Sequence, residues 1–441
     1  MNTNPSLALG PILRVSSLGL PAARGDEDLV ARVAACELEP HTFRLCREFA
    51  THVGVTDEFR SVVDHFGTEA GHTPAGFRVQ LELGGDGVLR ADLVRDIAYD
   101  ADGALRPTNV LFSADTANPY ELEPIAPLLA NLTCNPGIIY DLFINNPQAN
   151  IDHKFSTRDE VMAEVGRILG PGADISVELN NPFEKDFGLI LEEAEKFREM
   201  LSKWRVVIKV PHTGPVNAGN VSQLLNGAKK LDQRWWQPAT ADALRGHNLA
   251  LKLREHGFRV NFTLMFEPYQ AQLALQAKPY FINSFVRHRL IQTRHIATLL
   301  DDHDMGGGDV TVAELRRYLV DTDNLAVTDT DYDANEVLAL ARRMVAYRGI
   351  TATEGDGLDG ARHNLRVLRQ CNLPDTRLII CSMEGPTMYP DIDRLLAEPE
   401  FEDMTDRVVI TAEPAYLARF TSTGQVVSYQ RRFMSAAAGQ H

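Results

Sequence analysis

The chain has 441 residues, of which 44% are hydrophobic, and a formal net charge of −16. This length allows one α/β barrel with additions, while the acidic balance argues against nucleic acid and anionic membrane surfaces as partners. No run approaches the roughly 18 apolar residues of a membrane span. The five cysteines form no CxxC pair, which argues against a disulfide framework or a zinc site. We therefore predict a soluble cytoplasmic protein.

Residues 1–105 form the first segment, which we interpret as an N-terminal extension of mixed helix and strand. Apolar residues recur at helical spacing in residues 27–35 and 42–53, and residues 77–83 alternate as a half-buried strand does. The stretch from Gly84 to Gly87 predicts a turn after this strand. We find no catalytic constellation in this segment of the sequence.

From about residue 106 the pattern changes to short apolar runs that alternate with helical stretches. The runs predict eight strands, near residues 110, 132, 176, 207, 260, 281, 379 and 408. Helical spacing predicts helices over residues 120–129, 159–169, 187–204, 216–230, 239–256 and 269–277. This alternation favours an α/β fold, a closed (β/α)8 TIM barrel over residues 106–441. An open doubly wound sheet is the alternative, but no glycine-rich phosphate fingerprint follows the first strand.

Two segments are longer than a minimal barrel needs, residues 211–257 and 290–375, and we expect both to be helical insertions. Within the second, the acidic stretch 329–333 suggests a calcium-binding loop. Ala334 stands where such a loop has glycine and Leu340 where it has glutamate, so we reject that interpretation. The acids instead precede a predicted helix, whose dipole they complement.

Polar side chains stand at or just after the ends of seven predicted strands. They are Asp115, Asn135, Glu178, Lys209, Asn261 with Thr263, Asn283 and Ser382. The carboxyl ends of the strands in a barrel open at one mouth, so we expect these side chains to converge. A single buried polar residue would need only a hydrogen-bond partner, but one common site explains the whole set.

Lys209 is the most informative of these residues, because it interrupts an otherwise apolar strand. Burial disfavours an ammonium, so we expect a lowered pKa and a neutral amine that attacks a carbonyl to form a Schiff base. The alternative is a lysine whose ammonium reaches solvent. Schiff-base aldol chemistry also needs an acid for the loss of water, a role that suits Glu178 with Thr263. It needs a base on the sugar hydroxyl, a role that suits Asp115.

The order and spacing of these motifs resemble the transaldolase family, class I Schiff-base enzymes on a (β/α)8 barrel. The resemblance covers residues 108–290, with a weaker match at 377–420. It rests on Ala114-Asp115-Thr116, Thr133-Cys-Asn-Pro136, Val177-Glu178, Ile208-Lys209-Val-Pro211, Val260-Asn-Phe-Thr-Leu-Met-Phe266 and Phe281-Ile-Asn-Ser-Phe-Val286. It implies that Lys209 forms the Schiff base and that Asp115 is the acid/base residue. It also implies that Glu178 and Thr263 handle the catalytic water, and that Asn135 and Asn261 bind substrate.

Three positions depart from the family's pattern. They are Asn283 in place of a serine, His288 between Arg287 and Arg289 in place of an arginine, and Ser382-Met-Glu384 in place of Ser-x-Arg. An acid at the last position removes a contact to a sugar phosphate and adds a like charge. Either Arg287, Arg289 or a basic residue of the insertions takes over the phosphate, or the substrate is not phosphorylated in the usual place. We expect an altered substrate.

We predict a transaldolase-like enzyme that transfers a three-carbon dihydroxyacetone unit between sugars. The resemblance implies a role in carbohydrate metabolism, in the pentose phosphate pathway. The predicted substrate-binding residues are Asn135, Asn261, Asn283, Ser382, Arg287 and Arg289. Three alternatives stay open: an aldolase that releases the three-carbon ketone, a Schiff-base enzyme for a non-sugar carbonyl, and a barrel that binds a sugar without turnover.

The lysine itself serves as the electron sink of this chemistry, so we expect no metal and no organic cofactor. The expected partner is a small sugar or sugar phosphate, and the sequence does not fix the oligomeric state. His212, His247 and His256 show no ligand spacing with a carboxylate, and we expect them at the surface or facing the substrate.

Overall fold

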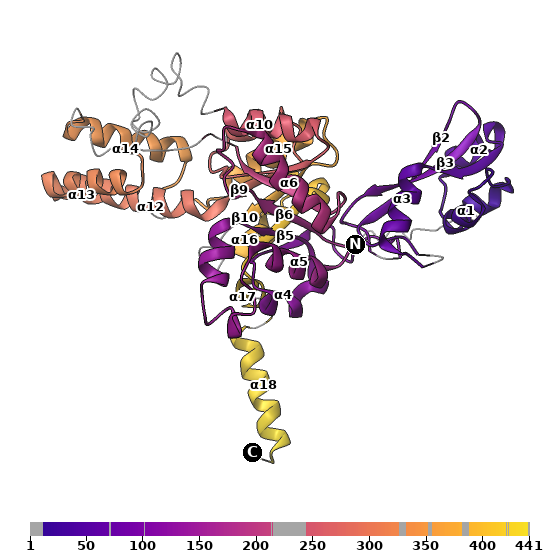
Figure 1. Cartoon of the computed structure of the whole chain (residues 1–441). Coiled ribbons are helices and arrows are strands. Elements are labelled where there is room, and N and C mark those ends of the chain that lie inside the picture. Colours follow the sequence, from indigo (N-terminus) through magenta and orange to yellow (C-terminus); the bar gives the residue numbers. More distant parts are fainter. Residues whose placement is uncertain are drawn as a thin grey trace, which may run out of the picture. The chain divides into compact units, whose positions relative to one another are not determined.

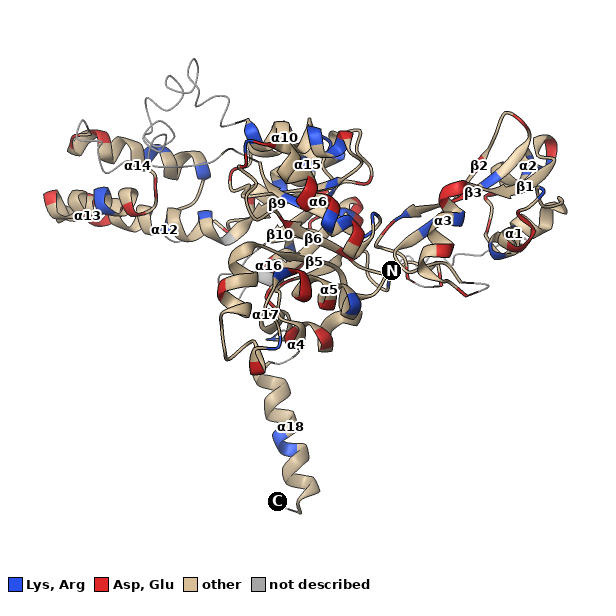
Figure 2. Cartoon of the chain, in the orientation of Figure 1, with Lys and Arg blue, Asp and Glu red and all other residues tan. Residues whose placement is uncertain are grey.

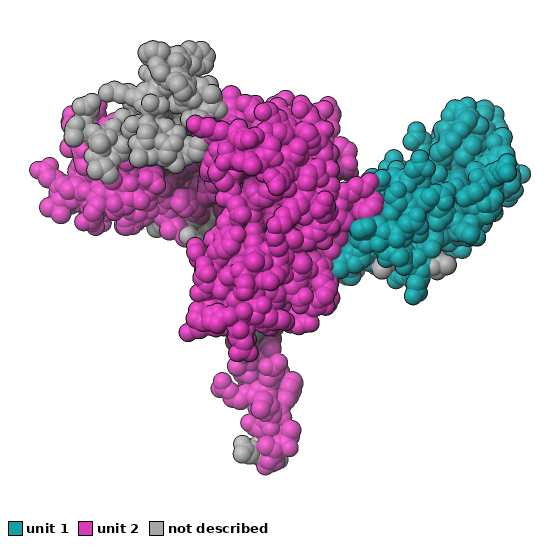
Figure 3. Space-filling model, in the orientation of Figure 1, with its two compact units in different colours: residues 1–108, 169–174 teal, residues 109–168, 175–441 magenta. Residues whose placement is uncertain are grey.

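The computed structural model describes residues 12–69, 72–100, 102–212, 214, 244–325, 332–351, 355–381, 388–419, 421 and 423–439. The chain divides into two compact units, residues 1–108 with 169–174 and residues 109–168 with 175–441 (Figure 3). The first unit is a small mixed domain, and the second contains the barrel and a helical insertion.

Eight parallel strands close into a barrel in the second unit, which confirms the predicted (β/α)8 fold (Figure 1). Their order around the barrel follows the chain, and the pairing of the last strand with the first closes the ring. The strands are β4 (Leu111–Asp115), β5 (Leu129–Cys134), β6 (Asp174–Glu178), β7 (Val206–Pro211), β8 (Arg259–Thr263), β9 (Phe281–Phe285), β10 (Arg377–Cys381) and β11 (Val408–Ala412). Nearly every residue in them is buried, as expected of parallel strands covered on both faces.

Helices connect and cover these strands. The α-helices are α4 (Pro119–Leu122), α5 (Arg158–Leu169), α6 (Phe187–Leu201), α10 (Arg245–Glu255), α11 (Gln270–Leu275), α15 (Asp359–Gln370), α16 (Met388–Leu396), α17 (Pro414–Arg419) and α18 (Gly424–Ala437). Shorter 3₁₀ or π-helical segments are η2 (Glu123–Leu128), η3 (Ile138–Ile144), η4 (Ile151–His153) and η6 (Pro399–Arg407). The predicted helix 216–230 and the first residues of the predicted helix 239–256 lie outside the described residues.

The predicted helix over residues 120–129 is wrong beyond its first turn. The α-helix α4 ends at Leu122, and the chain continues as the 3₁₀ helix η2. Pro124 and Pro127 lack the backbone N–H that an α-helix interior needs, so the regular hydrogen-bond pattern stops there. Leu129 already belongs to strand β5.

Acidic and basic residues are mixed along the outer helices of the barrel (Figure 2). On α6, for example, Lys196 pairs with Asp159 of α5, and Arg198 pairs with Glu195 one turn away. Exposed pairs of this kind contribute roughly 0–1 kcal/mol each. Among the described helices, none combines the length and the apolar composition needed to cross a bilayer.

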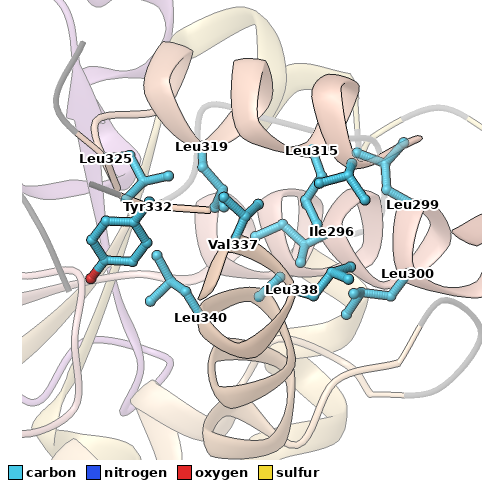
Figure 4. Packing of buried hydrophobic residues seen from close by; sticks show 12 residues of the cluster. Ile296, Leu299, Leu300, Leu315, Leu319, Leu325, Tyr332, Val337, Leu338 and Leu340 are labelled. Carbon is cyan, nitrogen blue, oxygen red and sulfur yellow. The ribbon is translucent and has the colours of Figure 1, made fainter. Parts of the chain in front are cut away.

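The second predicted insertion contains helices with a core of their own. They are α12 (Val286–Asp302), η5 (His303–Gly307), α13 (Gly308–Asp321) and α14 (Ala334–Arg348). Ile296, Leu315, Leu319 and Val337 are fully buried between them (Figure 4). At the start of α14, the Asp333 side chain accepts hydrogen bonds from two backbone N–H groups, as expected of an acid that begins a helix.

The first unit contains a three-stranded sheet in the order β1-β3-β2. Its elements are η1 (Val15–Leu18), α1 (Glu27–Val33), α2 (Pro40–Phe49), β1 (His52–Val55), α3 (Asp57–Phe66), β2 (Phe77–Leu83) and β3 (Val88–Arg95). The predicted strand at 77–83 is confirmed, and the predicted turn joins it to β3. The predicted helix 42–53 is wrong at its end: Ala50 adopts an extended conformation, and His52–Val55 pairs with β3 as a strand.

Candidate active site

The four predicted catalytic residues stand at or near the carboxyl ends of four barrel strands. Asp115 ends β4, Glu178 ends β6, Lys209 lies near the end of β7, and Thr263 ends β8. In the strand register, Glu178 is paired with Lys209, and Lys209 is paired with Asn261. Paired residues of parallel strands face the same side of the sheet, so these side chains share one mouth of the barrel.

Lys209 is 6% exposed, and its Nζ lies 3.4 Å from Oε2 of Glu178. Burial alone would lower the pKa of Lys209, as the sequence suggested. The carboxylates of Asp115 and Glu178 outweigh burial, and the pKa of Lys209 is raised. The expectation of a lowered pKa is therefore wrong for the free site, because the sequence does not show how close the two carboxylates come.

Burial raises the pKa of the Glu178 carboxyl, and the ammonium of Lys209 opposes this effect only in part. One ammonium and two carboxylates share the same site, so one carboxylate is left without a compensating cation. Glu178 consequently holds a proton more readily than an exposed glutamate does. A carboxyl group of this kind is suited to donate a proton.

Arg158 fixes the end of strand β6 that carries Glu178. Its guanidinium is 5% exposed, donates to the backbone carbonyl of Glu178 and pairs with Glu193 of α6. Nothing in the sequence distinguishes this arginine, because it begins helix α5 and does not stand at the end of a strand. Its contacts hold the strand end in place, and its charge lowers the pKa of the Glu178 carboxyl, an effect smaller than the opposing effect of burial.

Thr133 of β5 holds the carboxyl group of Asp115. Its hydroxyl donates to Oδ1 of Asp115 over 2.9 Å. One layer deeper, Asn131 donates to the hydroxyl of Ser113 and accepts from that of Ser176, which ties β4, β5 and β6 together inside the barrel. The signal for Thr133 was its place two residues after Asn131, since alternate residues of a strand face the same side.

Asp115 also borders a cavity of about 270 Å³ at the barrel mouth. Glu121, Ile138, Phe143 and Pro414 contribute to its walls. This volume is slightly below the usual range of small-molecule sites, about 300–1,000 Å³. The cavity therefore provides room for a small polar molecule beside the Asp115 carboxyl.

Thr263 is 2% exposed and lies two residues beyond Asn261 on the same face of β8. The next residue, Leu264, has a φ of 56°, a left-handed conformation that is uncommon for a residue with a side chain. The chain thus turns sharply just after Thr263, and such strained backbone is frequent next to functional residues.

The three predicted substrate-binding asparagines differ in their surroundings. Asn135 accepts a hydrogen bond from the backbone N–H of Ile138 over 2.9 Å, so its side-chain oxygen already serves the turn after β5. Asn261 and Asn283 are completely or almost completely buried, and Nδ2 of Asn283 donates to Oδ1 of Asn261 over 2.5 Å. The structure therefore brings the last two together inside the barrel.

Arg289 lies in a buried charge cluster with Glu267, Arg348 and Asp359. The arginine is 2% exposed; its Nε lies 3.2 Å from Glu267 and its Nη1 lies 2.5 Å from Asp359. Arg348 of α14 pairs with the same glutamate at 2.8 Å, which links the helical insertion to the loop after β8. Two carboxylates already compensate Arg289, so this geometry gives no support to its predicted contact with a substrate phosphate.

Two other predicted substrate residues fall where the structure gives no side-chain geometry. Arg287 lies in α12, and its side chain is outside the described part of the chain. Ser382, together with Glu384, also lies outside the described residues. Among the described residues, no group of three or more histidine, cysteine or acidic side chains is arranged to hold a metal ion.

Two of the histidines expected at the surface or facing the substrate pack together instead. His212 is 5% exposed, and its ring lies 4.9 Å from that of Phe262 and 5.8 Å from that of His247. Burial, together with His247, lowers the pKa of His212 to about 4. His212 is thus a neutral packing residue near neutral pH, whereas His256 is exposed.

The family model described as Transaldolase/Fructose-6-phosphate aldolase matches residues 112–295. This segment runs from β4 into α12 and includes Asp115, Glu178, Lys209 and Thr263 at the ends of their strands. No curated protein matches the chain. The residues before β4 and those from the middle of α12 onward lie outside the match. Over this barrel segment, the chain is similar to the transaldolase/fructose-6-phosphate aldolase family.

Proposed function

We propose that the protein is a Schiff-base enzyme that transfers a three-carbon dihydroxyacetone unit between sugars, with Lys209 as the nucleophile. The observation that carries this proposal is the buried pair of Lys209 and Glu178, 3.4 Å apart, in the mouth that also holds Asp115. The family description names two aldol-type activities, transaldolase and fructose-6-phosphate aldolase. Both need a carbonyl-activating group and a base, and this mouth offers candidates for each.

The first step needs a neutral amine on Lys209 and a proton on Glu178. Transfer of one proton from the ammonium to the neighbouring carboxylate creates both species at once. Burial raises the pKa of Glu178 and favours this transfer, whereas the raised pKa of Lys209 opposes it. Schiff-base formation then proceeds from the form of the pair in which the proton lies on Glu178.

The neutral amine of Lys209 attacks the ketose carbonyl and forms a carbinolamine. Glu178, assisted by a water held at Thr263, donates a proton to the departing hydroxyl group, which leaves as water. Asp115 then removes the proton from the C4 hydroxyl group, the C3–C4 bond breaks, and its electron pair moves into the iminium to give an enamine. The released aldehyde leaves.

The enamine next attacks the carbonyl carbon of an acceptor aldehyde, which forms a new carbon–carbon bond. Asp115 returns its proton to the new hydroxyl group, and hydrolysis of the Schiff base frees Lys209. If no aldehyde is present, Asp115 returns its proton to the enamine carbon, and hydrolysis of the resulting iminium releases dihydroxyacetone and frees Lys209. This aldolase activity is the second candidate, because the matching family description names both reactions.

The substrate we propose lacks a phosphate in the usual place. Arg289 is paired with Glu267 and Asp359, so it offers no free positive charge in this arrangement. Glu384 stands in the sequence where the family has a phosphate-binding arginine. A carboxylate there repels a phosphate. The cytoplasmic location and the place in the pentose phosphate pathway remain predictions.

The test is an assay of purified protein with free and phosphorylated ketoses, each with and without an aldehyde acceptor. We expect turnover that depends on the acceptor and is faster with a free ketose. Release of dihydroxyacetone at the same rate without an acceptor would instead support the aldolase. A preference for fructose 6-phosphate at ordinary efficiency would contradict the altered substrate, and no turnover with any ketose would contradict the enzyme proposal.

A further inference from the structure

A line of buried hydrogen bonds crosses three neighbouring strands beside the proposed nucleophile. The Cys381 thiol of β10 donates to Oδ1 of Asn283 of β9 over 3.0 Å. Nδ2 of Asn283 donates in turn to Oδ1 of Asn261 over 2.5 Å and to the backbone carbonyl of Phe262. Cys381 is 8% exposed, Asn283 is 1% exposed and Asn261 is fully buried.

The chemistry of these groups fixes the direction of both amides. A backbone carbonyl only accepts, so the atom of Asn283 that faces Phe262 must be the NH₂ group. The oxygen of Asn283 then faces Cys381, whose thiol hydrogen it accepts. The same NH₂ group faces Asn261, which must therefore present its own oxygen, and the NH₂ group of Asn261 points elsewhere.

That NH₂ group, Nδ2 of Asn261, is fully buried and has no hydrogen-bond partner among the described residues. A buried donor left unsatisfied costs roughly 1–3 kcal/mol, so its presence calls for an explanation. Asn261 is the register partner of Lys209 on the neighbouring strand, and both face the barrel mouth. The residue that carries the unsatisfied donor is thus the strand neighbour of the residue that we assign as the nucleophile.

We propose that Cys381 and Asn283 are positioning residues that hold the Asn261 amide with its donor toward a substrate oxygen. This inference, which we call the hydrogen-bond relay, rests on the proposed function and adds two positioning residues to it. The bound ketone carries an acceptor oxygen, a hydroxyl, on a carbon next to the one that Lys209 attacks. Hydroxyketones therefore fit the site, and simple ketones leave the Asn261 donor unsatisfied.

Asn283 is suited to this task in a way that a serine is not. A hydroxyl group has one hydrogen, so it cannot donate to Asn261 and Phe262 simultaneously while accepting from Cys381 in the same geometry. The planar amide has two donors on one side and an acceptor on the other, and it bridges β8 to β10. The departure from the serine of the family pattern therefore comes with a defined hydrogen-bonding role.

The experiment measures borohydride trapping at Lys209 with dihydroxyacetone, hydroxyacetone and acetone as probes. Its readouts are the ketone concentration that gives half-maximal trapping and the maximal trapping rate. For the wild-type protein, the relay predicts half-maximal trapping at much lower concentrations of the two hydroxyketones than of acetone. Equal half-maximal concentrations for all three probes would mean that the Asn261 donor does not contribute to ketone binding and would overturn the relay.

The variants separate the relay from general packing. Cys381→Ala removes the thiol donor, and we expect the half-maximal concentration of dihydroxyacetone to rise about threefold to tenfold with a smaller change in maximal rate. Cys381→Ser keeps a donor and should reverse most of this loss. Asn283→Asp cannot donate to Asn261 or Phe262, and we expect a rise of about 100-fold or more.

Cys134→Ala is the matched control, because this buried cysteine of β5 contacts Met162 and takes no part in the relay. It also creates a small cavity in a barrel strand, but it should leave the half-maximal concentration unchanged. Two results would overturn the relay. One is a half-maximal concentration for Cys381→Ala that equals that of Cys134→Ala. The other is a half-maximal concentration for Cys381→Ser that is as high as that of Cys381→Ala.

Failure of the proposed function is a separate outcome. If the wild-type protein traps none of the probes at Lys209, the Schiff-base proposal is contradicted. The relay is then tested without substrate by selective ¹⁵N labelling of asparagine and NMR. Slow proton exchange at the Asn283 side chain that is lost in Cys381→Ala and kept in Cys381→Ser supports it; exchange unaffected by both variants contradicts it.

Discussion

The two halves of the barrel wall carry different kinds of side chain at the same mouth. Strands β4 to β7 contribute ionisable groups, namely Asp115, Glu178 and Lys209. Strands β8 to β10 contribute groups that stay neutral near neutral pH, namely Asn261, Asn283 and Cys381. Burial raises the pKa of the Cys381 thiol far above its ordinary value, so this cysteine too remains uncharged.

The difference suggests that proton transfer and substrate orientation are assigned to opposite walls. The ionisable groups shift one another's pKa because they share a buried space, as the raised pKa of Glu178 illustrates. The neutral groups hold one another in fixed directions without competing for protons. Changes in the first half should alter rates and pH dependence, whereas changes in the second half should alter substrate affinity.

The largest effects are expected from Glu178→Gln and Asp115→Asn, which keep the size of each side chain. Each should lower kcat by about 10² to 10⁴, because a general acid or base is lost. The two variants should differ in borohydride trapping: Glu178→Gln slows Schiff-base formation, while Asp115→Asn forms the adduct but does not break the carbon–carbon bond. Equally slow trapping in both variants would contradict the separate roles.

The pH dependence of Schiff-base formation should follow the single proton that Lys209 and Glu178 share in the reactive form. Burial raises the pKa of Glu178 above its ordinary value of 4.5. Below this raised pKa both groups are protonated and Lys209 has no neutral amine, so the trapping rate should rise as pH rises through it. The proton on Glu178 stabilises the fold fully below pH about 4.5, and this stabilisation is lost as pH rises through the folded pKa. Glu178→Gln should flatten both profiles, as measured by trapping and by urea unfolding across pH.

Thr133→Val tests whether the hydrogen bond from Thr133 positions the Asp115 carboxyl group. Valine has nearly the same shape but removes the 2.9 Å hydrogen bond to Asp115. We expect a fall in kcat of about tenfold, with little change in KM, since a hydrogen bond to a carboxylate contributes about 1.5 kcal/mol or more. Thr133→Ser should restore most of the rate; a serine variant as slow as the valine variant would point to packing instead.

Thr411→Val changes β11, the strand that joins β10 of the neutral half to β4, and it has the smallest expected effect. Thr411 is 3% exposed, and its hydroxyl has no hydrogen-bond partner among the described residues. Replacing an unsatisfied buried hydroxyl by a methyl group should stabilise the fold by about 1 kcal/mol and leave trapping unchanged. A large rise in the half-maximal ketone concentration would instead place Thr411 among the substrate-binding residues.

The sequence predicted the barrel because its signal is local. Each predicted strand is a short apolar run, in most cases with a polar residue near its end. This pattern lies within a few consecutive residues, so it can be recognised without knowledge of the tertiary structure. The prediction failed at residues 120–129, where Pro124 and Pro127 override helical spacing. It also failed at His52–Val55, where pairing with β3 overrides an apparent helix.

The site was predictable as a set of residues but not as a set of interactions. The position of Lys209 in an apolar strand was visible, whereas the raised pKa depends on distances to Asp115 and Glu178 that only the closed barrel creates. Arg289 offered a free cation in the sequence, but the fold pairs it with Glu267 and Asp359. Such pairings join residues that are far apart in the chain, so no local sequence pattern predicts them.

The most direct test of the central claim is borohydride trapping with dihydroxyacetone, read by peptide mass spectrometry on the wild-type protein, Lys209→Met and the control Lys252→Met. Lys252 is exposed on α10 and takes no part in the proposed chemistry. We predict a ketone-dependent adduct on Lys209 in the wild type and in Lys252→Met, and none in a folded Lys209→Met variant. An adduct on another lysine, or none on folded wild-type protein, would contradict the account.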